Sequence, residues 1–336
     1  MPAIPADSLI VVTGITGYVA SHVGLAALQA GYRVRGTVRS LGRVEEVKEG
    51  YSKYGADVSK LEFVELDDLE SEAQFANAIR GADGVAHVAL PGSVPGDSDE
   101  IPKQAVNSTI AILHAASKEP SVKRVVFTSS SVAVISPPGF KEQPLTDKDW
   151  NDAAQQKWEI ATEKDKEKPS WGMLRYAVTK VLSEKAAWKW MEENKPTFDI
   201  VTILPNANFG PVLWGSARST AGWIQATAHG DGTYTTNVPP QWYIDVRDDG
   251  RLHVLALSDP SLGGKRIWAA AGPFSWNSII RTLHKEFPWL QLPPEVPGAQ
   301  GEPDRQKIDN SVATKALGGW ISLEQSVVDT AKTLGF

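Results

Sequence analysis

The chain has 336 residues with 34 basic and 40 acidic side chains, a formal net charge of −6 and no cysteine. Without cysteine there is no disulfide framework, thiolate zinc site or cysteine nucleophile. Lys and Arg are scattered, which argues against a nucleic-acid partner. The segment 1–8 lacks the basic region of a signal peptide, and no apolar run approaches the ~18 residues of a membrane span, so we expect a cytoplasmic address and no membrane partner.

The first 205 residues alternate short, β-branched apolar runs with longer helical patterns, which is typical of parallel βαβ units. Several runs are apolar throughout, as in strands that helices cover on both faces. Two helical patterns end at glycines, Gly31 and Gly81, as helices commonly do. The predicted strands are Leu9–Val12, Arg33–Val38, Leu61–Glu65, Gly84–Val88, Arg124–Phe127 and Ile200–Leu204, and the predicted helices include Tyr18–Ala30, Glu72–Arg80 and Trp171–Glu193.

Beyond residue 205 the pattern loosens into turns with aromatic residues between them, followed by predicted helices at 248–257, 275–286 and 322–334. All twelve tryptophans lie at or beyond position 150, so this half either encloses an apolar substrate or uses Trp to fill its core. We therefore expect an α/β protein with two parts. A Rossmann-type doubly wound parallel sheet would take 1–205, with 241–260 returning to it, and a smaller α/β substrate lobe would take 206–240 and 261–336.

The first predicted strand runs directly into Thr13-Gly14-Ile15-Thr16-Gly17-Tyr18-Val19-Ala20, a G-x-x-G-x-x-A turn that opens a helix. Gly14 permits a tight turn, Gly17 lets the backbone approach a pyrophosphate, and Ala20 is small enough for close contact between helix and strand. The helix N-terminus adds N–H donors and a positive dipole. The turn predicts dinucleotide binding through Thr13, Gly14, Thr16, Gly17, Tyr18 and Val19.

The end of the second strand indicates which dinucleotide binds. NAD enzymes place an acid there against the ribose 2′-hydroxyl, whereas NADP enzymes place an arginine against the 2′-phosphate. The strand ends at Arg39 and Ser40, and no acidic residue appears before Glu45. The planar guanidinium of Arg39 suits a phosphate, with Ser40 and Arg43 assisting. We expect NADP(H) rather than NAD(H).

A Y-x-x-x-K pair, Tyr176 and Lys180, lies on one face of the predicted helix from 171 to 193. The fifth predicted strand is followed by Thr128-Ser129-Ser130-Ser131, which puts hydroxyls at the carboxyl end of a parallel strand, where ligands of open α/β sheets bind. A serine, the phenol and the ammonium can therefore meet at this edge.

Together these motifs resemble the extended short-chain dehydrogenase/reductase superfamily, with the nearest likeness to fungal NADPH-dependent carbonyl and aldehyde reductases. Plant dihydroflavonol reductases and yeast-type methylglyoxal reductases are more distant. The likeness is carried also by Arg35–Ser40, Val122–Ser130, Trp150-Asn151, Ala186–Trp188 and Leu204–Asn206. It implies Ser130, with Ser129 and Ser131 as alternatives, for the catalytic serine, and it implies cofactor contacts from Asp68, Leu69, His87, Val88, Ala89, Pro205 and Asn206. In some relatives the position of Asn107 orients a water.

Carbonyl reduction needs a hydride on carbon and a proton on oxygen. The nicotinamide would supply the hydride and Tyr176 the proton. Lys180 would favour the phenolate and bind the ribose hydroxyls, while Ser130 would hold the carbonyl oxygen. The resemblance thus predicts an NADPH-dependent reduction of an aldehyde or ketone.

The segment 206–245 contains only two basic side chains, Arg218 and His229. A diphosphate would require more cations there, so an apolar or aromatic carbonyl is the expected small-molecule partner. Three alternatives stay open: a sugar-nucleotide epimerase or dehydratase, a non-redox NADP-binding protein, and a biosynthetic enzyme that uses the pocket for another step. The six histidines show no metal-ligand spacing, and both a monomer and a homodimer are compatible with the sequence. The expected substrate-binding residues are Phe209, Trp214, Trp223 and Trp242.

Overall fold

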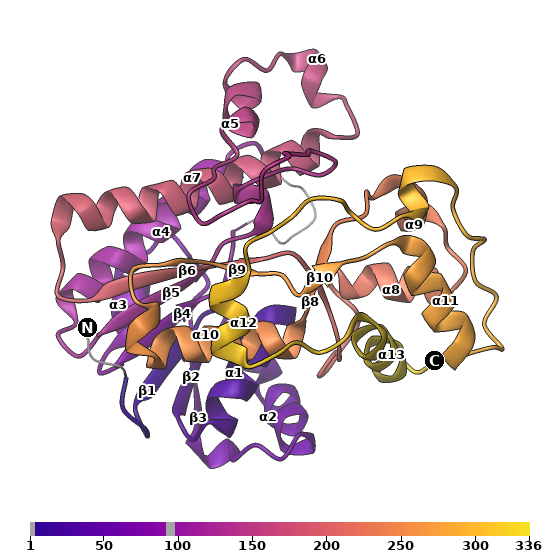
Figure 1. Cartoon of the computed structure of the whole chain (residues 1–336). Coiled ribbons are helices and arrows are strands. Elements are labelled where there is room, and N and C mark those ends of the chain that lie inside the picture. Colours follow the sequence, from indigo (N-terminus) through magenta and orange to yellow (C-terminus); the bar gives the residue numbers. More distant parts are fainter. Residues whose placement is uncertain (1–3, 92–97) are drawn as a thin grey trace.

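The computed structural model describes residues 4–91 and 98–336, so residues 1–3 of the N-terminal segment lie outside the described part. Figure 1 shows a large sheet between two layers of helices, with a smaller lobe beside it. All neighbours in the large sheet are parallel, in the order β3-β2-β1-β4-β5-β6-β9. Its strands are β1 (Leu9–Val12), β2 (Arg33–Val38), β3 (Leu61–Glu65), β4 (Gly84–His87), β5 (Arg124–Thr128), β6 (Asp199–Pro205) and β9 (Arg266–Ala269).

This order is the doubly wound arrangement that the βαβ alternation predicts, and the expected α/β Rossmann-type fold is confirmed. The first three predicted strands have the predicted bounds, and the next three differ by a residue at one or both ends. The chain reverses direction along the sheet between β1 and β4. In open α/β sheets a ligand binds at such a switch point, beyond the carboxyl ends of the strands.

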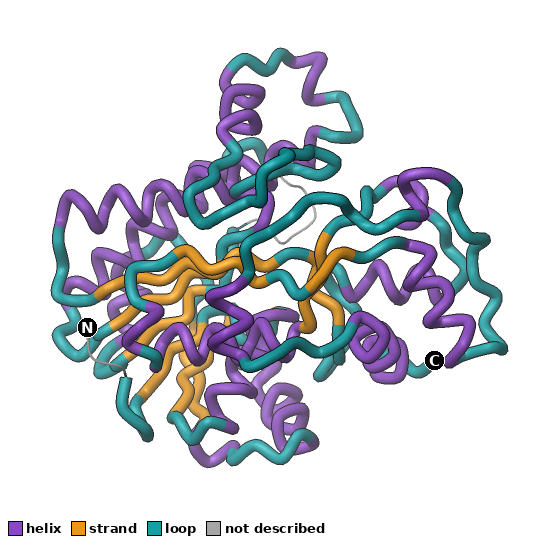
Figure 2. The backbone as a smooth tube through the Cα atoms, in the orientation of Figure 1, coloured by secondary structure: helices purple, strands orange, loops and turns teal. Residues whose placement is uncertain are grey.

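The helices cover both faces of the large sheet (Figure 2). The strands alternate their side chains between the two layers, so Ile10 and Val12 enter one apolar core while Leu9 and Val11 enter the other. The first core lies against α1, α2, α10 and α12, and the second lies against α3, α4 and α7. These helices are α1 (Tyr18–Gln29), α2 (Val44–Lys53), α3 (Glu72–Ile79), α4 (Ile101–Lys118), α7 (Trp171–Asn194), α10 (Val246–Ser258) and α12 (Ser311–Leu317).

The smaller lobe contains a mixed three-stranded sheet in the order β10-β8-β7. Its core is rich in aromatic side chains, including Phe274 and Trp276, and it lies against α8, α11 and α13. The elements of this lobe are β7 (Ala207–Phe209), β8 (Trp242–Asp245), β10 (Gly272–Pro273), α8 (Ala221–Ala228), α9 (Thr233–Asn237), α11 (Trp276–Glu286) and α13 (Leu323–Thr333). Two further helices, α5 (Asp152–Glu159) and α6 (Glu163–Lys166), project from the edge of the molecule next to α7 (Figure 1).

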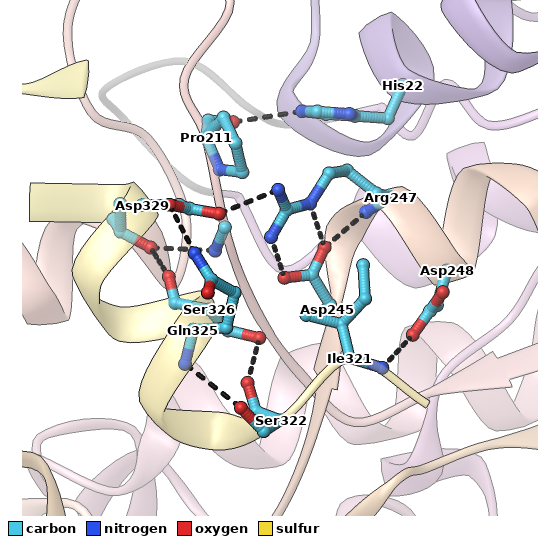
Figure 3. A network of polar contacts seen from close by, with 12 residues as sticks. His22, Pro211, Asp245, Arg247, Asp248, Ile321, Ser322, Gln325, Ser326 and Asp329 are labelled. Carbon is cyan, nitrogen blue, oxygen red and sulfur yellow. Dashed lines mark hydrogen bonds and ion pairs between the residues drawn. The ribbon is translucent and has the colours of Figure 1, made fainter. Parts of the chain in front are cut away.

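A polar network fastens α10 to α13 and lies beside α1 (Figure 3). Arg247 of α10 donates to the fully buried Asp245 and also pairs with Asp329 of α13 at 2.7 Å. The neighbouring Asp248, also fully buried, accepts a 2.8 Å hydrogen bond from the Ile321 amide. On the α1 side, His22 lies 2.9 Å from the Pro211 carbonyl, so residues distant in sequence are held together where the large sheet meets the lobe.

Candidate active site

The glycine-rich turn follows β1 at the switch point. Gly14 has a φ of +65°, which glycine adopts without strain, and its amide donates to the Thr37 hydroxyl at 2.9 Å. A Cβ on Gly14 would lie 3.1 Å from the Ala89 side chain, so the turn packs closely on the segment after β4. Helix α1 then begins at Tyr18, and no side chain caps its N-terminus at Gly17. The first backbone amides of α1 therefore have no side-chain cap and are available to an anionic ligand.

Thr13 joins the ends of β1 and β4 from inside the protein. Its hydroxyl oxygen accepts hydrogen bonds of 3.0 Å from the amides of Val88 and Ala89 and lies 3.1 Å from Nδ1 of His87. Burial and, to a smaller extent, the charge of Lys180 together lower the pKa of His87 to about 3. The Thr13 side chain therefore links the glycine-rich turn to the segment after β4. The Tyr18 side chain is likewise engaged, because its hydroxyl donates to the Gly210 carbonyl.

The residues expected at the adenosine end lie at the exposed edge of the sheet. Arg39 follows β2, is exposed, and has no ion-pair or hydrogen-bond partner for its guanidinium within residues 4–91 and 98–336. Ser40 caps a short turn by accepting from the Gly42 amide. Asp68 is exposed, whereas Leu69 packs partly against the second core. Arg39 is thus available to an external phosphate, while Arg43 is paired with Glu46.

The end of β5 and the middle of α7 bring the three expected catalytic side chains together. Ser130 is buried and its hydroxyl acts to lower the pKa of the Tyr176 phenol, but burial has the larger effect and raises that pKa overall. Tyr176 as a whole residue is 40% exposed, so burial affects its hydroxyl while another part of the residue lies at the surface. Lys180 is buried one turn further along α7, and its ammonium donates to the Thr128 carbonyl at 2.8 Å. Burial lowers the pKa of Lys180 to about 8, although the carboxylates of Glu184 and Asp249 oppose this shift.

Glu184, one further turn along α7, was not among the expected site residues. It is nearly inaccessible and accepts hydrogen bonds from Ser129 at 2.6 Å, from Thr202 at 2.7 Å and from Arg266 of β9 at 2.7 Å. Ser129 is therefore committed to Glu184, which distinguishes it from Ser130. Extending the spacing of Tyr176 and Lys180 by four residues finds Glu184 in the sequence.

Other expected positions have mainly structural contacts. Pro205 ends β6 in a buried position, and the Asn206 amide bonds to the Ala269 carbonyl. The Asn107 side chain is directed away from the catalytic group, since it donates to Glu70 at the surface. Asn151 instead holds the segment after Ser130, because its side-chain amide donates to the Val132 carbonyl and to the Ser136 hydroxyl, both at 2.8 Å.

Of the four aromatic residues expected to bind substrate, Trp242 lines a cleft. Phe209 is fully buried and contacts Trp223 and Phe274 in the core of the lobe, so its ring has no surface left for a ligand. Trp214 packs edge-on against Tyr51, with ring centroids 5.1 Å apart. The burial of Phe209 argues against a direct substrate contact, whereas Trp214 and Trp223 are partly exposed and their role in substrate binding stays a prediction.

The cleft has a volume of about 760 Å³. Trp242 also packs against the apolar cluster that contains Val134 and Ile135, in the segment that follows Ser130. Segments 143–146 and 307–309 border it, and Leu145 and Ile308 join them through a parallel bridge. The residues that line the cleft are Gln143, Pro144, Thr146, Trp242, Lys307, Ile308 and Asp309.

The sequence pattern of the NAD dependent epimerase/dehydratase family matches residues 10–270, from β1 through β9. The chain belongs to this family. It is 36% identical over 336 residues to Aldehyde reductase 2 of Sporidiobolus salmonicolor, covering 97% of this chain and 96% of the relative. It is 34% identical to Ketoreductase adrE of Penicillium rubens, covering 96% of each chain.

Among solved structures, yeast methylglyoxal/isovaleraldehyde reductase Gre2, complexed with NADPH, superposes with a TM-score of 0.81 at 25% identity, covering 97% of this chain and 98% of Gre2. The expected membership of the extended short-chain dehydrogenase/reductase superfamily is thereby confirmed, and these relatives of the epimerase/dehydratase family are oxidoreductases. Among the helices of residues 4–91 and 98–336, none combines the length and the apolar composition needed to cross a membrane.

Proposed function

We propose that the protein reduces an aldehyde or ketone to an alcohol with NADPH. The observation that carries this proposal is the convergence of Ser130, Tyr176 and Lys180 at the carboxyl end of β5. This edge adjoins the glycine-rich turn. The amides of Val88 and Ala89 donate to Thr13 of that turn, and the charge of Lys180 lowers the pKa of the preceding residue, His87. The aldehyde reductase and the ketoreductase that resemble the whole chain support the same reaction.

The residues at the switch point fit a dinucleotide. The positive φ of Gly14 and the uncapped N-terminus of α1 provide a close backbone approach and free donors for a pyrophosphate. Arg39 offers an unpaired guanidinium where a 2′-phosphate would lie, so we assign NADP(H) rather than NAD(H). When bound, the reduced nicotinamide supplies the hydride for the carbonyl carbon.

The protein supplies the proton and holds the oxygen. Ser130 donates to the carbonyl oxygen and aligns it with the hydroxyl of Tyr176. Burial keeps the pKa of Tyr176 above its ordinary value, so the phenol carries its proton at neutral pH. Tyr176 then gives this proton to the oxygen as negative charge develops there, and the ammonium of Lys180 stabilises the resulting phenolate.

We base the proposed substrate class on the residues that line the cleft, including Trp242. The cleft has apolar surfaces from Trp242, Pro144 and Ile308. The charged side chains in its lining, Lys307 and Asp309, are both exposed. A bulky carbonyl compound with an apolar or aromatic substituent is therefore the proposed substrate class.

The test is NADPH oxidation by the purified protein with a panel of aldehydes, keto esters and aryl ketones, with NADH as the second cofactor. We expect Tyr176→Phe to abolish turnover while the affinity for NADPH stays within about threefold of wild type. Tyr54→Phe is the matched control, because Tyr54 is similarly exposed but lies at the end of α2. Full activity of Tyr176→Phe, or tightly bound NAD(H) in the purified protein, would contradict the proposal.

A further inference from the structure

Helix α10 carries two buried groups that the proposed reaction does not use. Asp249 and His253 lie one turn apart, and both side chains are fully inaccessible. Nε2 of His253 lies 2.7 Å from the hydroxyl of Thr128, the last residue of β5. The carbonyl of the same Thr128 accepts the 2.8 Å hydrogen bond from Lys180. A continuous chain of contacts therefore runs from Asp249 through His253 and Thr128 to Lys180.

The partners of His253 determine the direction of these hydrogen bonds. Nδ1 lies 2.8 Å from the backbone carbonyl of Asp249 and 3.2 Å from its carboxylate, and both of these groups only accept. Nδ1 therefore carries a hydrogen, and in the neutral ring Nε2 must accept from the Thr128 hydroxyl. This bond fixes the side chain of Thr128, the residue whose backbone carbonyl Lys180 contacts.

The charge of Asp249 is poorly compensated. Neither of its oxygens receives a hydrogen bond within residues 4–91 and 98–336, and its one ion-pair contact there is with His253, which is charged only when protonated. Glu184, the other carboxylate close to Lys180, is paired with Arg266 and accepts two hydroxyl hydrogen bonds. Asp249 lies in the first turn of α10, where the helix dipole favours a negative charge.

Several titratable groups face Lys180 from the elements packed around it in the described part of the chain. Glu184 of α7 and His87 of β4 line a small cavity with Lys180, and Tyr176 lies one turn before Lys180 on α7. On α10, the charge of Asp249 acts on Lys180 and His253 contacts Thr128, whose carbonyl binds Lys180. Helix α4 contributes the uncharged Ser108 and Thr109 to the same small cavity of about 30 Å³. Among these groups, Glu184 and Asp249 raise the pKa of Lys180 against the effect of burial, but only the charge of Asp249 lacks a strong base as partner.

We propose that Asp249, His253 and Thr128 are positioning residues for Lys180. They keep the Thr128 carbonyl in contact with the ammonium of Lys180. The carboxylate of Asp249 adds a negative charge that acts on the same ammonium. The proposal rests on the role of Lys180 in the proposed carbonyl reduction, but the charge of Lys180 can be measured without that reaction.

The first experiment is competitive labelling of the unliganded protein with acetic anhydride over a pH series, with the Lys180 peptide quantified by mass spectrometry. Asp249→Asn should move the titration of Lys180 to lower pH by about half a unit or more, because an opposing charge is removed. Asp248→Asn is the matched control: Asp248 is equally buried on the same helix but binds Ile321, so its loss lowers thermal stability without moving this titration. An unchanged Lys180 titration in Asp249→Asn would overturn the electrostatic part of the proposal.

The second experiment separates positioning from folding. His253→Leu removes the acceptor for Thr128, and we expect kcat to fall roughly tenfold or more while KM for the carbonyl compound stays within about twofold. His253→Gln retains a hydrogen-bonding atom at the same reach and should restore a large part of kcat. In Asp249→Asn the alkaline loss of kcat should begin at lower pH than in wild type.

Equal kcat for the Leu and Gln variants of His253, at equal folded fractions by circular dichroism, would refute the positioning role. Failure of the reductase proposal itself is recognised separately, because the wild-type protein would then oxidise no NADPH with any carbonyl compound, or Tyr176→Phe would retain full activity. The Lys180 titration still reports on Asp249 in that case.

Discussion

The buried pair of Glu184 and Arg266 should show a large coupling in unfolding experiments. Their side chains are only 1% and 8% exposed, so removal of one partner leaves a charge in a poorly solvated place. Such a loss costs about 3–5 kcal/mol when nothing else compensates the remaining charge. Arg266 would keep hydrogen bonds to the carbonyls of Asp147 and Asp149 and its position over the Trp150 ring, 3.7 Å from the centroid. We therefore expect Glu184→Gln to lower the free energy of unfolding by about 2–4 kcal/mol.

Arg266→Met should have a similar cost, because Glu184 would keep only neutral donors, the hydroxyls of Ser129 and Thr202 and the more distant Trp188 indole at 3.4 Å. In the double variant neither charge remains, so its loss of stability should fall short of the sum of the single losses by about 1.5–3 kcal/mol. Urea unfolding followed by tryptophan fluorescence, with coincident circular dichroism, measures all four free energies. Additivity within about 0.5 kcal/mol would refute the argument that the two charges stabilise each other.

Three further predictions concern the cofactor edge, acid stability and helix packing. Arg39→Ala should reduce the preference for NADPH over NADH by at least tenfold in kcat/KM, and an unchanged preference would exclude Arg39 from 2′-phosphate binding. Burial lowers the pKa of His22 to about 4, below its unfolded value, so its contribution to stability is complete above about pH 6.5 and is lost as pH falls toward 4. His22→Gln should thus remove about 2 kcal/mol of the destabilisation that urea titrations detect between pH 7 and pH 5. Gly250→Ala would place a Cβ 2.6 Å from the His22 carbonyl, so we expect about 1–3 kcal/mol of destabilisation, and an unchanged melting temperature would refute tight packing of α1 on α10.

Local patterns were sufficient for most of the large sheet. The uninterrupted apolar run Leu9–Val12 has the predicted bounds, and the helical spacing of Tyr176 and Lys180 placed both residues on one face of α7. The strand β9 was missed because its four residues begin with Arg266, whose charge is paired with Glu184 of α7, 82 residues earlier in the chain. Pairing of this kind depends on the assembled fold, and no local window contains it.

The aromatic residues show a different limit. Phe209, Trp214 and Trp223 occur in the same loop-rich segment as Trp242, but their contacts are with core rings while Trp242 lines the cleft. The side-chain type predicts only that an aromatic residue is shielded from water. Packing in the core and contact with a bound ligand both provide that shielding. Contacts between distant segments decide between them.

The bridge between Leu145 and Ile308 has a consequence for the order in which the molecule is completed during synthesis. Part of the cleft lining comes from residues 143–146, whereas a neighbouring part comes from residues 307–309, which a ribosome makes much later. The seven parallel strands are all encoded before residue 270, so a nascent chain can hold the large sheet while the cleft still lacks residues 307–309. Since domains fold as units during translation, we expect the large sheet with its glycine-rich turn to form before the lining of the cleft is complete.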